Sequence, residues 1–142
     1  MKITICGSQT NAKKICDIKE KLEQLGHEVY SHELMKKYAA GETSVIEEVK
    51  KNHSGMKIKN NTFLWYYEKI KQSDAILVCN FKKNNIPGYI GGSVLMEMGH
   101  AYVLNKKIFL LNPIPELNYK DEILATQPII LNGNISNIIL AK

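Results

Sequence analysis

Apolar residues recur along the chain in blocks whose spacing alternates between that of a strand and that of a helix. Residues 2–6 alternate in character and predict a first strand. Residues 11–25 carry apolar side chains at spacings of three and four, as one face of a helix does, and Gly26 ends that helix. We expect a short second strand at residues 27–30.

The region that follows is helical in pattern but interrupted. Residues 31–71 have helical spacing, with breaks near Gly41 and in the polar stretch 52–61. Residues 74–80, DAILVCN, form a continuous apolar run, which is typical of a central strand covered on both faces. The remaining predicted elements are a loop at 81–92, an apolar helix that contains Glu97, a strand at 107–111, a helix at 119–126, a strand at 129–131 and a closing helix at 135–141.

This alternation of strands and helices predicts an α/β fold with a mostly parallel sheet and right-handed crossovers. Its predicted strands favour a flavodoxin-like (Rossmann-like) doubly wound sheet of five strands in the order 2-1-3-4-5. That order places the loop after the first strand beside the loop after the third, at the switch point where open sheets bind ligands. The length of 142 residues fits a single domain, residues 1–142, without an internal repeat or linker.

The amino-acid composition limits the classes of partner that we expect for this chain. Apolar residues make up 44% and charged residues 23%, and no apolar run reaches the roughly 18 residues of a membrane span, so we expect a cytoplasmic protein without a membrane partner. The net charge is +5, but every basic residue is lysine, and specific base readout depends on arginine, so a lysine-rich nucleic-acid-binding protein is the third and least favoured interpretation. Cys6, Cys16 and Cys79 lie in apolar contexts and are interpreted as reduced core thiols.

Glu97 is the strongest candidate for a functional side chain. It lies within the apolar run VLMEMGHAYVL, where burying a carboxylate without a partner costs several kcal/mol. The start of its helix should keep the group ionised, because the helix dipole and free amides favour an anion there. Ser93 and Ala101 share its helix face, and Gly99 is expected to serve close packing. The alternative is that Glu97 only complements the helix start or pairs with a lysine.

Two glycine-containing turns are candidate ligand-binding segments. Gly7 and Ser8 follow the first strand, where backbone amides and a hydroxyl can hold a phosphate or a sugar hydroxyl. A plain tight turn is the alternative. Gly91, Gly92 and Ser93 precede the Glu97 helix in the same way, and Ser93 could equally be the N-cap residue of that helix.

The other candidates are single residues near predicted strand ends. Tyr89 could stack on a base or cover the site, or it could only pack over the loop. Asn80 and Asn112 lie at the carboxyl ends of the third and fourth strands and are either ligand-binding or turn residues. His100 is interpreted as a packed or partly exposed side chain, although it is the one histidine placed to act as an acid. The chain has no metal-ligand spacing, Walker loop or dinucleotide fingerprint, so we expect no metal or cofactor.

The segments ICGSQT, SDAILVCN and GGSVLMEMGHAYVLNKKIFLL together resemble the nucleoside 2-deoxyribosyltransferase superfamily, which includes the 2'-deoxynucleoside 5'-phosphate N-hydrolases. The resemblance covers residues 70–112 well and the first 30 residues weakly. It implies that Glu97, within an E-x-G-x-A motif, is the nucleophile that attacks the anomeric carbon. It also implies that Cys6, Gly7, Ser8 and Ser93 lie at the substrate, and that the protein forms a homodimer or larger oligomer.

Three positions depart from the pattern of that superfamily. Tyr66 stands where the family has a catalytic aspartate, and Glu68 lies on a different helix face. Gly91 stands where the transferase branch has an acidic residue. The chain also has no arginine to hold a phosphate, which mildly favours a nucleoside over a nucleotide.

We therefore expect an enzyme that cleaves or transfers at the N-glycosidic bond of a (deoxy)nucleoside or nucleoside 5'-monophosphate. A carboxylate can stabilise or trap the oxocarbenium-like state that forms when this bond breaks. The alternative is a non-catalytic nucleotide-binding or sensing domain of the same fold. The sequence leaves open the base, the sugar, the need for a phosphate and the acceptor.

Overall fold

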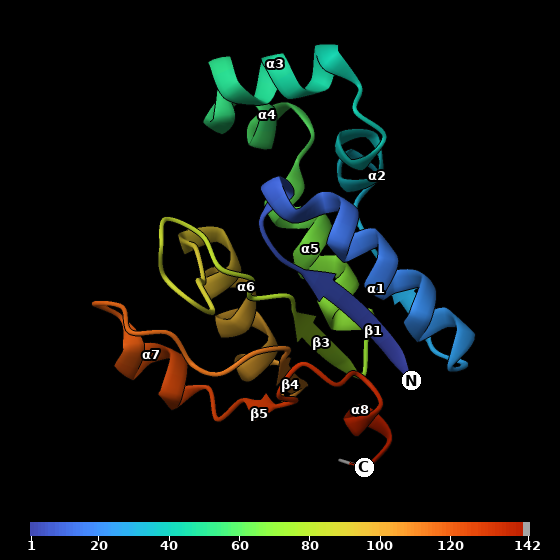
Figure 1. Ribbon diagram of the computed structural model, residues 1–142, viewed down its shortest axis with the longest axis vertical. Coiled ribbons are helices and arrows are strands. Elements are labelled where there is room, and N and C mark those ends of the chain that lie inside the picture. The colour runs from blue at the N-terminus through green and yellow to red at the C-terminus, as the bar shows by residue number, and fades with distance from the viewer. Residues whose placement is uncertain (141–142) are drawn as a thin grey trace.

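A computed structural model describes residues 1–140 and contains one sheet of five parallel strands (Figure 1). The strand order is β2-β1-β3-β4-β5, and every neighbouring pair is parallel. This order confirms the predicted α/β, flavodoxin-like doubly wound fold. The strands are β1 Lys2–Cys6, β2 Glu28–Tyr30, β3 Ala75–Val78, β4 Lys107–Leu110 and β5 Ile129–Ile130.

Helices connect the strands and cover both faces of the sheet. On one face α1 and α8 pack against the strands, and on the other face α5, α6 and α7 do so. A short 3-10 helix, η1 Gln9–Asn11, precedes α1. The helices are α1 Ala12–Gln24, α2 Glu33–Ala39, α3 Thr43–Lys51, α4 His53–Lys59, α5 Thr62–Gln72, α6 Gly92–Val103, α7 Lys120–Ala125 and α8 Asn137–Leu140.

The first strand shows how the sequence pattern builds the two layers. Successive side chains of a strand point to opposite faces, so Ile3 and Ile5 pack with α1 while Cys6 packs with α5 and α6. Ile15 and Leu22 of α1 lie two turns apart on one helix face and are fully buried against β1. The orientation of Cys6 follows from the same alternation, and it places the thiol on the side of the sheet where Glu97 lies.

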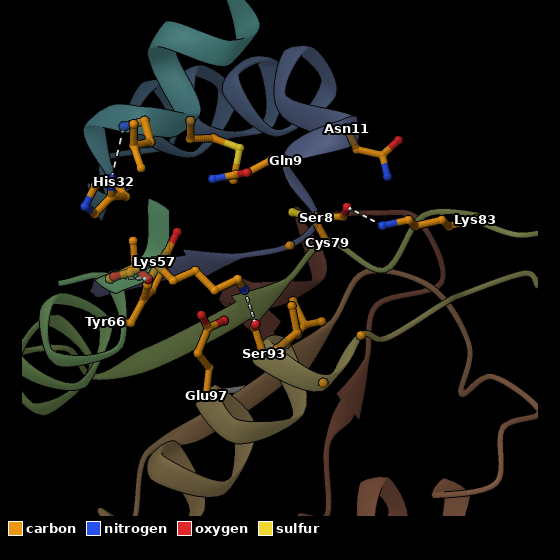
Figure 2. A pocket seen from close by; sticks show the side chains of 18 of the residues that line it. Ser8, Gln9, Asn11, His32, Lys57, Tyr66, Cys79, Lys83, Ser93 and Glu97 are labelled. Carbon is orange, nitrogen blue, oxygen red and sulfur yellow. Dashed lines mark hydrogen bonds between the residues drawn. The ribbon is translucent and has the colours of Figure 1, made fainter. Parts of the chain in front are cut away.

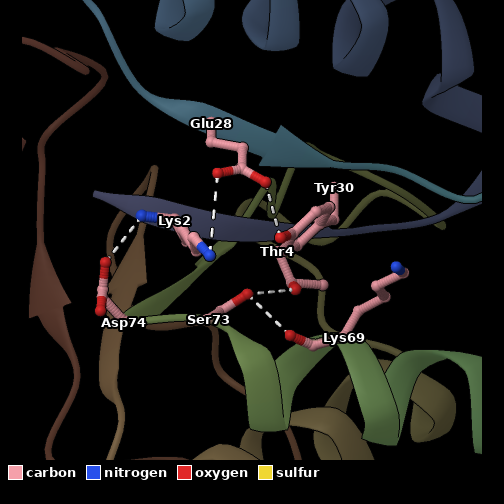
Figure 3. A network of polar contacts seen from close by, with 7 residues as sticks. All are labelled: Lys2, Thr4, Glu28, Tyr30, Lys69, Ser73 and Asp74. Carbon is pink, nitrogen blue, oxygen red and sulfur yellow. Dashed lines mark hydrogen bonds and ion pairs between the residues drawn. The ribbon is translucent and has the colours of Figure 1, made fainter.

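A network of polar contacts ties β1 to the segment that enters β3 (Figure 3). The buried Thr4 hydroxyl lies 2.8 Å from the Ser73 hydroxyl, which donates to the Lys69 carbonyl at 2.8 Å. Asp74 accepts a hydrogen bond of 2.7 Å from the backbone amide of Lys2. Asp74 therefore lies immediately before β3, which begins one residue after its predicted start, and satisfies a strand-end amide.

Residues 31–71, whose helical pattern is interrupted, form four helices. Three of them, α2, α3 and α4, lie above the sheet in Figure 1. The break expected near Gly41 is present, with φ of 75° at that residue. Breaks in the stretch 52–61 are also present, one at Asn52 between α3 and α4 and one at Asn60 and Asn61 before α5. Between them residues 53–59 form α4, which Asn52 caps by accepting a 3.0 Å hydrogen bond from the Gly55 amide. Only a short turn at Asn60 and Asn61 separates α4 from α5.

Most predicted elements otherwise differ from the observed ones by a residue or two at their ends. Sequence patterns fix such ends poorly, because buried residues can continue beyond the last paired position. Leu111 and Leu131, for example, are buried but lie just beyond β4 and β5. The closing helix was predicted to reach Ala141, which lies outside the described residues. Across residues 1–140 no helix is long and apolar enough to cross a membrane.

Candidate functional site

A cavity of about 270 Å³ opens at the carboxyl ends of β1 and β3, close to the lower size limit of small-molecule sites (Figure 2). Its lining comes from the loop after β1, the segment from α2 to α5, the loop after β3 and the start of α6. The strand order places β1 and β3 side by side, so the cavity lies at the predicted switch point.

Seven of the candidate site residues from the sequence line this cavity, namely Gly7, Ser8, Tyr89, Gly91, Gly92, Ser93 and Glu97. Cys6 lies behind the wall, in hydrogen-bonding contact with Glu97. Asn80 and Asn112 do not line the cavity. The fold therefore brings together segments that are more than 80 positions apart along the chain.

Glu97 is a buried carboxylate at this cavity, and only 6% of its surface is exposed. Burial raises its pKa to about 7, although the Cys6 thiol hydrogen bond and the charge of Lys57 act in the opposite direction. The expectation that the helix start keeps Glu97 ionised is therefore wrong. Since α6 begins at Gly92, Glu97 lies in the second turn, beyond the free amides of the helix end.

The hydrogen bonding of Glu97 is incomplete on the cavity side. Its Oε2 atom is buried and has no hydrogen-bond partner among the described residues. The Cys6 thiol remains protonated and can donate, because burial, followed by the nearby Glu97 charge, raises its pKa well above the usual value. Gln9 offers a second buried acceptor without a partner in the cavity wall, its Oε1 atom. A ligand that supplies donors would satisfy both oxygens.

Two lysines that were not among the predicted site residues line the cavity. Lys57, from α4, donates a hydrogen bond to the Ser93 hydroxyl (Figure 2). Lys83, from the loop after β3, donates to the Ser8 hydroxyl at 3.1 Å and lies 5.8 Å from the centre of the Tyr89 ring. Ser93 is not an N-cap residue, since Gly91 occupies that position and provides no side-chain cap.

Aromatic and imidazole groups form the wall opposite α6. The His32 ring packs in a T-shaped arrangement with Trp65, with 4.8 Å between the ring centres. It stacks on Tyr66 with 6.2 Å between the ring centres. Tyr66 lines the cavity beside Glu97 (Figure 2). Burial, and then the negative charge of Glu97, raises the pKa of Tyr66 well above its usual value, so its hydroxyl is a weak acid.

The histidines divide between the core and the cavity. His100 does not line the cavity and packs in a T-shaped arrangement with Tyr67, with 5.4 Å between the ring centres, as expected for a packed side chain. His32 and His53 do line it, although neither was singled out from the sequence. Residues 31–71 gave no motif and an interrupted pattern, so the sequence held no signal that could place His53 or Lys57 at the site.

Asn80 and Asn112 hold two strand ends together. The Asn80 side chain accepts a 2.8 Å hydrogen bond from the Asn112 amide and donates to three carbonyls, those of Gly88, Asn112 and Pro113. Asn112 in turn donates its side-chain amide to the Asn80 carbonyl at 3.1 Å. These contacts satisfy the side-chain amide groups of Asn80 and Asn112 within the protein. Both residues therefore hold the ends of β3 and β4 together and do not face the cavity.

Gly99 and Ala101 of α6 do not have the surroundings expected from the sequence. A Cβ atom on Gly99 would meet nothing within 4 Å, so close packing does not explain this glycine in the described chain. Ala101 is fully buried in the core rather than facing the cavity. Within residues 1–140 no group of three or more His, Cys, Asp or Glu side chains is arranged to hold a metal ion.

Comparisons with known proteins give one structural similarity. No protein-family model matches the chain. A search of curated proteins gives no significant match. Among solved structures, a CMP N-glycosidase from Clostridium botulinum, BcmB, aligns over 93% of this chain and 87% of its own, with a TM-score of 0.46 and 17% sequence identity. Similarity at this level assigns neither a family nor a function.

Proposed function

We propose that this protein is a nucleoside 2-deoxyribosyltransferase-like enzyme that cleaves or transfers at the N-glycosidic bond of a (deoxy)nucleoside or nucleoside 5'-monophosphate. The supporting observation is Glu97, a buried carboxylate whose Oε2 atom has no partner in the described chain and which lines the switch-point cavity. Keeping such a group in the core lowers stability, so a catalytic use accounts for it. The E-x-G-x-A resemblance supplies the reaction class.

In the proposed mechanism, an ionised Glu97 oxygen forms a bond to C1' of the sugar while the bond from C1' to the base nitrogen breaks. The bonding electrons leave with the base, which takes a proton from water. Tyr66 is a weak acid and does not replace the family aspartate in this step. Water, or a second base, then attacks C1' and releases Glu97 as a carboxylate, giving hydrolysis or transfer.

One observation favours a second candidate function, the binding or sensing of a nucleotide without turnover. No strong acid stands at the position of the family aspartate, where the chain has Tyr66. An enzyme without a general acid loses roughly 10²- to 10⁴-fold in rate. Such a protein would retain the cavity and its affinity but would release no base.

The proposal is tested by measuring base release from a panel of ribo- and deoxyribonucleosides and their 5'-monophosphates, with and without a second base as acceptor. We expect release that falls at least about 10³-fold in Glu97→Gln, because the amide cannot act as a nucleophile. The rate of the wild type should rise with pH through about 7 as Glu97 ionises.

Glu20→Gln is the matched control, because it removes one carboxylate from the exposed face of α1. It should leave base release unchanged. Release that persists in Glu97→Gln would exclude the nucleophile. Absence of release by the wild type, with thermal stabilisation by one of the nucleotides, would establish the binding domain instead.

A further inference from the structure

Four cavity-lining side chains from different parts of the chain form one polar group, which we call the lysine–serine cluster. Each lysine amine in it is held by one serine hydroxyl, Lys57 by Ser93 and Lys83 by Ser8. The four residues lie on the loop after β1, α4, the loop after β3 and the first turn of α6. The tertiary fold therefore converges two ammonium groups on the same cavity.

The charge of the cavity lining is unbalanced toward positive. Glu97 is the single carboxylate among the lining residues, which include two lysines. Burial lowers the pKa of His53, and the positive charges of Lys57 and Lys83 lower it further, so both lysines act on the same point of the cavity. A lining with this excess of positive charge attracts a ligand that carries negative charge.

The hydrogen-bond donors of the cluster are also available to an anion. The serine oxygens accept from the lysines, and each ammonium group has further N–H bonds to donate. At the start of α6, Gly91 provides no side-chain cap, so backbone amides of the first turn add donors at the same end of the cavity. Together these groups match the acceptor oxygens of a phosphate.

We propose that the lysine–serine cluster is a phosphate subsite and that the substrate is a nucleoside 5'-monophosphate in preference to the free nucleoside. This inference rests on the proposed function for the position of the sugar. Ser93 precedes Glu97 by four residues, about 6 Å along the helix axis, which is on the scale of a sugar ring. A sugar with its C1' at Glu97 can then place its 5'-phosphate at the lysine–serine cluster. The absence of arginine does not disfavour a phosphate here, because two lysines replace it.

The test compares nucleosides with their 5'-monophosphates for the wild type, Lys57→Gln, Lys83→Gln and the double variant. Dissociation constants are measured by calorimetry, and base release is measured on the same pairs. We expect the wild type to prefer the monophosphate. Each substitution should lower that preference about tenfold or more, since a charge-assisted hydrogen bond to phosphate contributes about 1.5–3 kcal/mol. Affinity for the uncharged nucleosides should change little.

Lys59→Gln and Lys82→Gln are matched controls, because each removes one exposed lysine from the same helix or loop without touching the cavity. They should keep the preference of the wild type. The phosphate subsite would be overturned if the wild type bound nucleosides and their monophosphates with equal affinity. It would also be overturned if Lys59→Gln and Lys82→Gln lowered the preference for monophosphates as much as Lys57→Gln and Lys83→Gln do. Lysine-dependent binding of monophosphates without any base release would keep the subsite and reject the proposed function. Base release from nucleosides alone would keep the proposed function and reject the subsite.

Discussion

At the scale of single residues, Glu97 shows a conflict between stability and the proposed chemistry. Cys6, Lys57 and Tyr66 are the titratable groups that interact with its carboxylate. The first two favour its ionised form through a hydrogen bond and a positive charge, but burial outweighs them and raises its pKa to about 7. The protein therefore holds a carboxylate that is protonated in about half of the molecules near neutral pH.

Glu97→Gln should make the protein more stable above neutral pH. Between about pH 4.5 and 7 the folded state binds more protons at Glu97 than the unfolded chain does, so the free energy of unfolding falls as pH rises. The loss approaches about 3 kcal/mol by pH 8. The variant should escape most of it, which urea titrations at pH 5, 7 and 8 would detect.

Glu20→Gln provides the control for this stability measurement, because its carboxylate is exposed. The stability profile of that variant should follow the wild type at all three pH values. Parallel profiles for the wild type and Glu97→Gln would show that Glu97 titrates normally in the folded protein, which would contradict the raised pKa.

At the scale of elements, α6 serves the core with one face and leaves another face open. Val94, Met98 and Ala101 are buried against the sheet. Met96 and Val103 are exposed, at 48% and 82% of their surfaces. Gly99 has open space where its side chain would be. A glycine inside a helix lowers its stability unless close packing requires it, and within the described chain no such contact exists.

Gly99→Ala should raise the free energy of unfolding by about 0.5–1 kcal/mol in the monomer, because alanine restricts the unfolded chain and clashes with nothing. Thermal denaturation would measure the change. Gly26→Ala is the contrasting variant, since Gly26 has φ of 89° and alanine is strained there. A loss of stability in Gly99→Ala that depends on protein concentration would show that the open face packs against a second copy.

At the scale of the whole molecule, the cavity is lined both by strand ends of the sheet and by residues of a smaller helical segment formed by α2, α3 and α4. That segment lies above the sheet in Figure 1. The sheet has two large core clusters, whereas this segment is centred on a small cluster of Leu34, Val49 and Met56. Fewer buried apolar contacts predict easier local opening. The segment nevertheless supplies Lys57 and His53 to the cavity, so one wall of the site is its least stable part.

Hydrogen exchange should therefore be fast in α3 and α4 and slow in β1 and β3. A bound nucleoside 5'-monophosphate should slow exchange in α4, because its phosphate would hold Lys57 against Ser93. Exchange followed by mass spectrometry, with and without the ligand, would check both expectations. Protection of α4 that matches β3 in the free protein, or that ignores the ligand, would contradict them.

The sequence by itself determined the sheet, because local periodicity and the alternation of elements are enough to define this fold class. The strand at 2–6, the buried run at 74–80 and the helix around Glu97 were all recognisable from spacing alone. Strand order followed from the rules of parallel sheets. The same rules placed Ser8 and Ser93 at one edge, since both begin segments that follow neighbouring strands.

Only the tertiary structure decided the chemistry around Glu97. Its raised pKa depends on burial, which spacing along one helix does not reveal. Lys57 reaches Ser93 because residues 53–59, between the two breaks of the polar stretch 52–61, form α4 with Asn52 as its cap. Asn80 and Asn112 looked like ligand-binding residues, yet they bind one another. Periodicity reports which face of an element is buried, whereas partners distant in the chain set the charge and hydrogen bonding of a site.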